Sequence, residues 1–111
     1  HSFPTRRSSD LDTRPTAFFA ASDTLAIGAM RALQEAAIRV PEDISIIGFN
    51  DISVAKYVSP TLTTVKVHTE WMGELAVETM KELCLNTPPV PRKIIVGTEF
   101  IQRDSTKHSS K

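Results

Sequence analysis

The chain has little cysteine, little glycine and no net charge, and each of these features excludes a class of protein. Its one cysteine, Cys84, cannot form an internal disulfide and suits a reducing compartment. A formal charge of zero, from 13 basic and 13 acidic residues, argues against a surface that coats nucleic acid. The four glycines are too scattered to form a phosphate-binding loop. No apolar run approaches the length of a membrane span, so no membrane partner is expected.

What remains is the composition of an ordinary globular protein. A length of 111 residues allows at most one domain, and 41% hydrophobic with 23% charged residues is usual for such a chain. The three histidines and Cys84 have no spacing typical of a zinc site, so we expect no metal and no cofactor. No Gly-x-Ser-x-Gly segment is present, and no motif supports catalysis; we therefore predict that the chain is not an enzyme.

Residues 1–11 resemble one reading frame of a common short-read sequencing adapter over their whole length. We interpret them as an artefact and exclude them from the fold, as for any segment added by cloning. A natural basic, Ser-rich linker is the alternative interpretation. If the segment is an artefact, we expect the gene to be truncated at its 5′ end, with any signal peptide or DNA-binding head out of view.

The next part of the chain predicts a strand, a helix and a second strand. Thr16–Ala21 and Ile44–Phe49 are short apolar runs, typical of strands buried on both faces of a parallel sheet. Thr24–Ile38 between them has the periodicity of an amphipathic helix, with an apolar face so broad that it predicts burial against more than one surface. The order of these elements predicts the α/β class, with a parallel sheet flanked by helices.

The remaining segments predict less regular structure around one long helix. Ile52–Val58 is expected to form a short helical turn, and Leu62–Val67 a third strand. Thr69–Leu85 predicts a second amphipathic helix, which ends before two prolines. Lys93–Arg103 predicts one or two strands, and residues 105–111 are expected to form a disordered polar tail.

Small polar residues follow both buried strands, at Ser22-Asp23 and at Asn50-Asp51. In an open α/β sheet, ligands bind in the crevice beyond the carboxyl ends of the strands. Ser22 and Asn50 offer a hydroxyl and an amide without fixed charge, which suits the alternating donors and acceptors of a sugar. We therefore predict that these two side chains bind a ligand. The alternative is that Ser22 only caps the helix and Asn50 only makes a turn.

Other residues near these positions are weaker candidates for the same site. Asp23 and Asp51 are interpreted first as caps of the segments that follow them and second as ligand-binding residues. A catalytic carboxylate pair would need raised pKa values and a defined separation, which spacing does not establish. Trp71 and Met72 begin the second helix, and Met72 is the better candidate to line the apolar side of a sugar site. Packing is the favoured alternative for both.

Three segments together resemble the LacI/GalR family of bacterial transcription regulators. They are Ala21–Met30, Val40–Asp51 and Ser59–Val65, and Gly73 and Phe100–Ser105 also fit. The resemblance covers about residues 15–105, in the order and approximate spacing of the family. It points to the C-terminal part of the effector-binding core, which is similar to periplasmic sugar-binding proteins.

The resemblance implies two α/β subdomains that close over a ligand, with the N-terminal part of the fold truncated. The C-terminal subdomain would comprise about residues 15–62 and 93–104, and residues 63–90 would belong to the N-terminal subdomain. Ser22 stands where the family often has an asparagine that contacts the effector, and Asn50 where many members have a ligand-binding aspartate. Ile27 and Tyr57 fall where the family tends to form its homodimer contact.

The function implied by the resemblance is regulation of transcription in the cytoplasm. A small-molecule effector, expected to be a sugar, would shift the orientation of the subdomains in a homodimer. Operator DNA would be bound through an N-terminal domain that this chain lacks, and a galactoside is the guess for the effector. The alternative is a periplasmic or extracellular sugar-binding protein of an uptake system. A small α/β enzyme is a third interpretation.

Overall fold

The computed structural model describes residues 15–107, and in it four strands form one sheet in the order β1-β2-β3-β4. These strands are β1 (Ala17–Phe19), β2 (Ser45–Asn50), β3 (Thr63–Lys66) and β4 (Glu99–Ile101). β1, β2 and β3 run parallel to one another, and β4 pairs antiparallel with β3. The predicted α/β class and the three strand positions are therefore confirmed. Each parallel strand is shorter than the apolar run that predicted it, or displaced from it by one residue.

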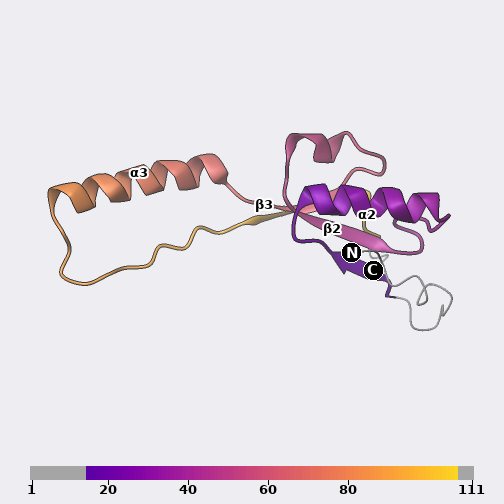
Figure 1. Cartoon of the computed structure of the whole chain (residues 1–111), viewed down its shortest axis with the longest axis horizontal. Helices are drawn as coiled ribbons and strands as arrows, with labels where there is room; N and C mark the ends of the chain where they lie inside the picture. Colours follow the sequence, from indigo (N-terminus) through magenta and orange to yellow (C-terminus); the bar gives the residue numbers. More distant parts are fainter. Residues whose placement is uncertain (1–14, 108–111) are drawn as a thin grey trace.

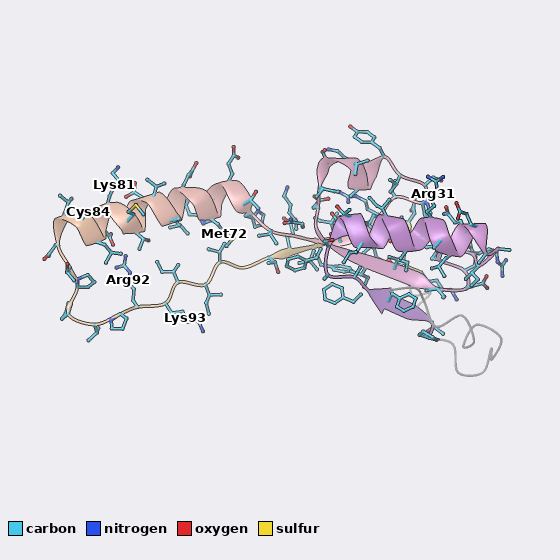
Figure 2. The ribbon with its side chains drawn as sticks, in the orientation of Figure 1. Arg31, Met72, Lys81, Cys84, Arg92 and Lys93 are labelled. Carbon is cyan, nitrogen blue, oxygen red and sulfur yellow. The ribbon has the colours of Figure 1, made fainter. Side chains whose placement is uncertain are left out.

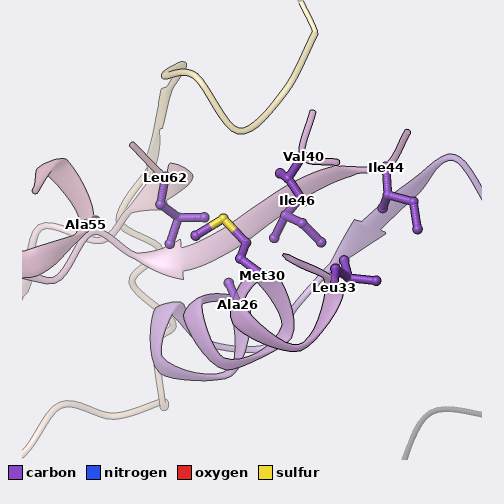
Figure 3. Close-up of a cluster of buried hydrophobic side chains, with 8 residues drawn as sticks. All are labelled: Ala26, Met30, Leu33, Val40, Ile44, Ile46, Ala55 and Leu62. Carbon is purple, nitrogen blue, oxygen red and sulfur yellow. The ribbon is translucent and has the colours of Figure 1, made fainter. Parts of the chain in front are cut away.

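One face of the sheet is covered by α2 (Asp23–Glu35), which runs beside β2 (Figure 1). The apolar stripe of this helix buries Ala26, Met30 and Leu33 against the sheet, as the helical periodicity predicted. Figure 3 shows the resulting core, which is completed by Val40, Ile44, Ile46, Ala55 and Leu62. The wider apolar surface of α2 remains open, and the side chain of Leu25 is 61% exposed.

The opposite face of the sheet carries aromatic side chains that no helix of residues 15–107 covers. Phe19 and Phe49 contact each other edge to face, with ring centroids 6.4 Å apart, while Phe19 stays 65% exposed. The prediction that β1 is buried on both faces is therefore wrong for this strand. A continuous apolar run shows that both faces of the strand are apolar, but it does not show that other elements pack against both faces.

Residues 51–62 cross over from the end of β2 to the start of its parallel neighbour β3. The predicted turn at Ile52–Val58 is a 3-10 helix, η1 (Ser53–Lys56), which buries Ala55 in the core.

Before β2, the Arg39 guanidinium forms a bidentate ion pair with Asp43. Hydrogen bonds and charge attraction from Asp43 raise the pKa of Arg39 above its ordinary value.

The long helix α3 spans Thr69–Leu85, the same limits that the sequence predicts, yet it buries none of its residues. It projects from the sheet along the longest axis of a molecule that measures 60 × 28 × 26 Å (Figure 1). Its exposed large apolar side chains are Trp71, Met72, Val77, Met80, Leu83 and Leu85. The predicted amphipathic face therefore exists, but no other element among residues 15–107 packs against it.

The chain returns from α3 to the sheet without regular structure until β4. The strand predicted at Lys93–Arg103 is thus confirmed only for Glu99–Ile101. Two segments leave and re-enter the sheet side by side, and His68 Nε2 lies 3.7 Å from Glu99 Oε1 between them. Thr63–Lys66 pair with β2 and form part of the sheet, and the assignment of residues 63–90 to a second subdomain stays a prediction.

The segment after β4 is ordered, and the prediction that the disordered tail begins at residue 105 is wrong. Ser105 and Thr106 are 0% and 8% exposed. The Ser105 hydroxyl accepts a hydrogen bond from the Thr63 N–H at 2.8 Å and donates one to the Ile46 carbonyl at 2.6 Å. Residues 1–11 and 108–111, for which an artefact and a tail were expected, lie outside the described residues. Within 15–107, no helix is long and apolar enough to cross a membrane.

Candidate ligand-binding site

The strand register brings the two predicted ligand-binding positions to one edge of the sheet. Phe19 of β1 pairs with Ile47 of β2, and Ala20 donates its N–H to the Ile47 carbonyl at 2.8 Å. Ser22 and Asn50 each lie three residues beyond that pair, toward the carboxyl ends of two parallel neighbours. The predicted adjacency of the two strand ends is confirmed, which gives the geometry that open α/β sheets use for ligands.

Ser22 is the N-cap of α2. Its backbone is extended, and its Oγ accepts a hydrogen bond from the Leu25 N–H at 3.2 Å. This contact satisfies one of the free amides at the start of the helix. The hydroxyl still has its own proton to donate, so capping does not use all of its hydrogen-bonding capacity. Its role in binding a ligand stays a prediction.

Asp23 is a buried acceptor that joins three parts of the fold. It is 0% exposed, and its Oδ1 accepts from the Thr64 hydroxyl at 2.6 Å while Oδ2 accepts from the Ile52 N–H at 2.7 Å. Both oxygens are therefore engaged within the protein, and the cap that the sequence assigned first to Asp23 is made by Ser22. A buried carboxylate is tolerated here because it has two hydrogen-bond donors and lies at the positive end of α2.

Gly48 leaves the space that the Asp23 carboxylate occupies. A Cβ atom on Gly48 would lie 2.2 Å from Asp23 Oδ1 and 2.9 Å from Leu62 Cδ2. Any side chain at this position would therefore collide with both the buried carboxylate and the core. This role was not predicted, because a scattered glycine within a strand is the only local signal for it. Such a glycine often marks a close approach of another group.

The turn after β2 is strained and presents the Asn50 amide to solvent. Asn50 and Asp51 have φ angles of 114° and 56°, in a region that residues with side chains rarely adopt. Asn50 is exposed, and among residues 15–107 its side chain makes no hydrogen bond. Strained residues held by their surroundings are typical of functional sites, so this turn supports the predicted role of Asn50.

Asp51 faces the protein rather than the open edge of the sheet. Its Oδ1 lies 2.9 Å from Arg103 Nη1, and its N–H donates to the Thr64 hydroxyl at 3.3 Å. The Asp51 and Arg103 side chains are 15% and 17% exposed. Arg103 is a second residue that the sequence analysis missed, since it drew attention only as part of the segment Phe100–Ser105.

Met72 lies apart from Ser22 and Asn50 in this arrangement. It is 43% exposed in the first turn of α3, which starts beyond the same carboxyl edge of the sheet (Figure 2). A separate hollow of 680 Å³ lies between the end of α3 and the returning segment, where Arg92 pairs with Glu82. None of the predicted ligand-binding residues lines that hollow. The role of Met72 stays a prediction.

The two predicted dimer residues differ in exposure. Tyr57 is 76% exposed beside η1, with the Lys56 ammonium 5.8 Å from its ring centre. Ile27 is half-buried on α2 and packs partly against the core. Exposed Leu25 lies on the same helix, so α2 keeps apolar surface that could contact a second copy. The dimer contact stays a prediction.

Comparison with known proteins decides which family carries this arrangement. Residues 2–106 match the family described as periplasmic binding protein-like domain, a range that extends into the segment interpreted as an artefact. The lactose operon repressor of Rhizobium radiobacter is 42% identical over 100 residues, which is 90% of this chain and 88% of that protein. The chain belongs to the LacI/GalR family of these domains.

Two further relatives bear on how much of a LacI/GalR protein the chain represents. The transcriptional regulator GalR of Streptococcus thermophilus is 50% identical over 95 residues. The aligned part is 86% of this chain but only 29% of that GalR, so the chain corresponds to less than a third of the relative. The crystal structure of the Lac repressor dimer bound to operator and the anti-inducer ONPF superposes with a TM-score of 0.81. That match has 30% sequence identity and covers 91% of this chain and 35% of the repressor.

These relatives favour regulation over uptake for this LacI/GalR chain. Both sequence relatives have the names of transcriptional regulators, and the solved structure is a repressor dimer on DNA. The names of the relatives describe a regulator and two repressors, and none of them describes an enzyme. The matched part is the periplasmic binding protein-like domain, in which the crevice beyond the sheet edge is the place to look for a ligand.

Proposed function

We propose that this LacI/GalR chain is the effector-binding and dimerising part of a sugar-responsive transcription regulator that acts in the cytoplasm. One observation carries the proposal: the Asn50 side-chain amide is exposed and makes no hydrogen bond within residues 15–107, on a strained turn at the carboxyl edge of the parallel sheet. Contacts of Asp51 and Ile52 with the protein hold that turn. The effector would be a neutral sugar, and the names of the relatives make a galactoside the first candidate.

The chemistry of the edge favours a polar and uncharged ligand. Asn50 offers two donors and one acceptor, and Ser22 adds a hydroxyl proton, which together suit neighbouring sugar hydroxyls. The two carboxylates nearby are already engaged, Asp23 by Thr64 and Ile52 and Asp51 by Arg103. Both carboxylates therefore already have a partner within the protein, which disfavours a cationic ligand.

Regulation would follow from a shift between two arrangements of the domain. A sugar held between the sheet edge and the region of α3, where Met72 lies, would bind one relative position of these parts more tightly than the other. Such a ligand shifts the equilibrium only by the ratio of its affinities for the two states. In a dimer that pairs through Ile27 and Tyr57, the shift would change how two DNA-binding heads meet an operator.

Calorimetric titration of the complete gene product tests this proposal. The ligands are galactose, lactose, ribose and cellobiose, with the purine hypoxanthine as a control for another class of small molecule. We expect at least one sugar to bind with a dissociation constant between about 1 µM and 1 mM, and to change the affinity for DNA from the protein's own promoter. If hypoxanthine binds and no sugar does, the effector is a purine and not a sugar. If nothing in the panel binds and the protein has no affinity for its promoter DNA, the proposal that it is a transcription regulator is wrong.

A further inference from the structure

Arg103 connects the end of β4 to the turn that carries Asn50. Its Nη1 lies 2.9 Å from Asp51 Oδ1 and donates to the Leu62 carbonyl, also at 2.9 Å. Its backbone N–H donates to the Thr63 hydroxyl at 2.8 Å, which fixes the Arg103 main chain to β3. Arg103 is thus held both by its backbone and by its guanidinium, and its side chain is largely shielded from water.

The segment that Arg103 holds would be unfavourable without such restraint. Two successive residues with positive φ and no glycine cost on the order of 1–3 kcal/mol each. Asn50 and Asp51 adopt this conformation at φ 114° and 56°. Other restraints on the turn lie in the backbone. Asn50 pairs with Lys66 of β3, the Asp51 N–H donates to Thr64 at a long 3.3 Å, and the Ile52 N–H donates to Asp23 at 2.7 Å. Among residues 15–107, the Arg103 ion pair is the one polar contact that holds a side chain of the turn.

We infer that Arg103 is a positioning residue for ligand binding, which acts on Asn50 through Asp51 and does not contact the ligand. This inference rests on the proposed function of Asn50. An ion pair with two largely buried partners is screened little by salt, so it can hold the turn where an exposed pair could not. Arginine suits the position because Nη1 carries two N–H bonds, one directed to the Asp51 carboxylate and one to the Leu62 carbonyl.

Amide hydrogen exchange, measured by NMR on the 15N-labelled chain, tests the restraint without any sugar. In Arg103→Gln we expect the Asp51 and Ile52 amides to exchange at least about tenfold faster, while Met30 and Leu33 in α2 change less than about twofold. Arg103→Lys should fall between the wild type and Arg103→Gln. The matched control is Arg31→Gln, which removes an ion pair whose side chains are 81% and 70% exposed and should leave the turn unchanged.

The outcomes separate this inference from the proposed function. Equal acceleration of all amides, or no acceleration at Asp51 and Ile52, overturns the positioning role whatever the sugar result. If Arg103→Gln does not fold, the nearly isosteric Asp51→Asn breaks the same ion pair and gives the same comparison. Titration with the sugar that binds best in the calorimetric panel then completes the test: we expect about tenfold weaker binding in Arg103→Gln. If the turn exchanges faster in Arg103→Gln but sugar affinity is unchanged, Arg103 does not position a ligand-binding residue. If neither Asn50 nor Arg103 variants weaken sugar binding, the proposed site itself is wrong.

Discussion

Replacing Gly48 with alanine should unfold much of the domain. The new Cβ would lie 2.2 Å from Asp23 Oδ1, a distance that no rotamer change at Gly48 can relieve because Cβ is fixed by the backbone. Overpacking alone costs about 1–3 kcal/mol, and displacing Asp23 would leave the Thr64 hydroxyl and the Ile52 N–H without their acceptor. We expect a loss of about 3 kcal/mol or more in the free energy of unfolding, a large part of the stability of a small domain.

Gly28→Ala is the matched control for this prediction. Gly28 lies in the middle of α2, and nothing lies within 4 Å of an added Cβ. Alanine in a helix interior is favoured over glycine by about 1 kcal/mol, so this variant should be more stable than the wild type. Urea unfolding followed by circular dichroism measures both. Equal effects of the two substitutions would contradict the close approach of Asp23 to the strand.

Removing the Asn50 amide should weaken effector binding without weakening the fold. Asn50→Gly is the informative change, because glycine adopts a φ of 114° freely whereas alanine would add strain to the loss of the amide. We expect the free energy of unfolding to stay the same or to rise by about 0.5–1 kcal/mol. The dissociation constant for the effector should rise about 10- to 100-fold, as for the loss of one or two good hydrogen bonds.

Asn86→Gly controls for the chemistry of this substitution. Asn86 is the other asparagine of the chain and follows the end of α3, on the hollow that none of the predicted ligand residues lines. Its replacement should leave effector affinity within about twofold of the wild type. Calorimetric titration of both variants of the complete gene product gives the comparison. Equal loss of affinity in the two, or none at Asn50, would remove Asn50 from the site.

Local patterns predicted the elements of this fold well. The limits of α3 at Thr69 and Leu85 were predicted because a threonine precedes the apolar period and two prolines follow it. The buried stripe of α2 was predicted from the helical periodicity of its apolar residues. Local patterns do not indicate which apolar surfaces other elements cover. For this reason the high exposure of β1 and α3 could not be predicted from their apolar composition.

The network behind the site depends on contacts between distant parts of the chain. Asp23 takes its two donors from residues 29 and 41 positions away, and Ser105 bonds residues 42 and 59 positions away. No local period reports such pairs, and a buried carboxylate looks like a helix cap in sequence. The edge positions Ser22 and Asn50 could be predicted because strand ends are local features, and a general rule places ligands there.

The most direct test of the account is to map the bound effector onto the sheet edge. Chemical shifts of the backbone amides, recorded while the sugar that binds is titrated into the 15N-labelled protein, report where it lies. We expect the largest changes at Ser22, Asn50 and Asp51, beyond the carboxyl ends of β1 and β2. Changes confined to the hollow between α3 and the returning segment, with the amides of Ser22 and Asn50 unmoved, would contradict it.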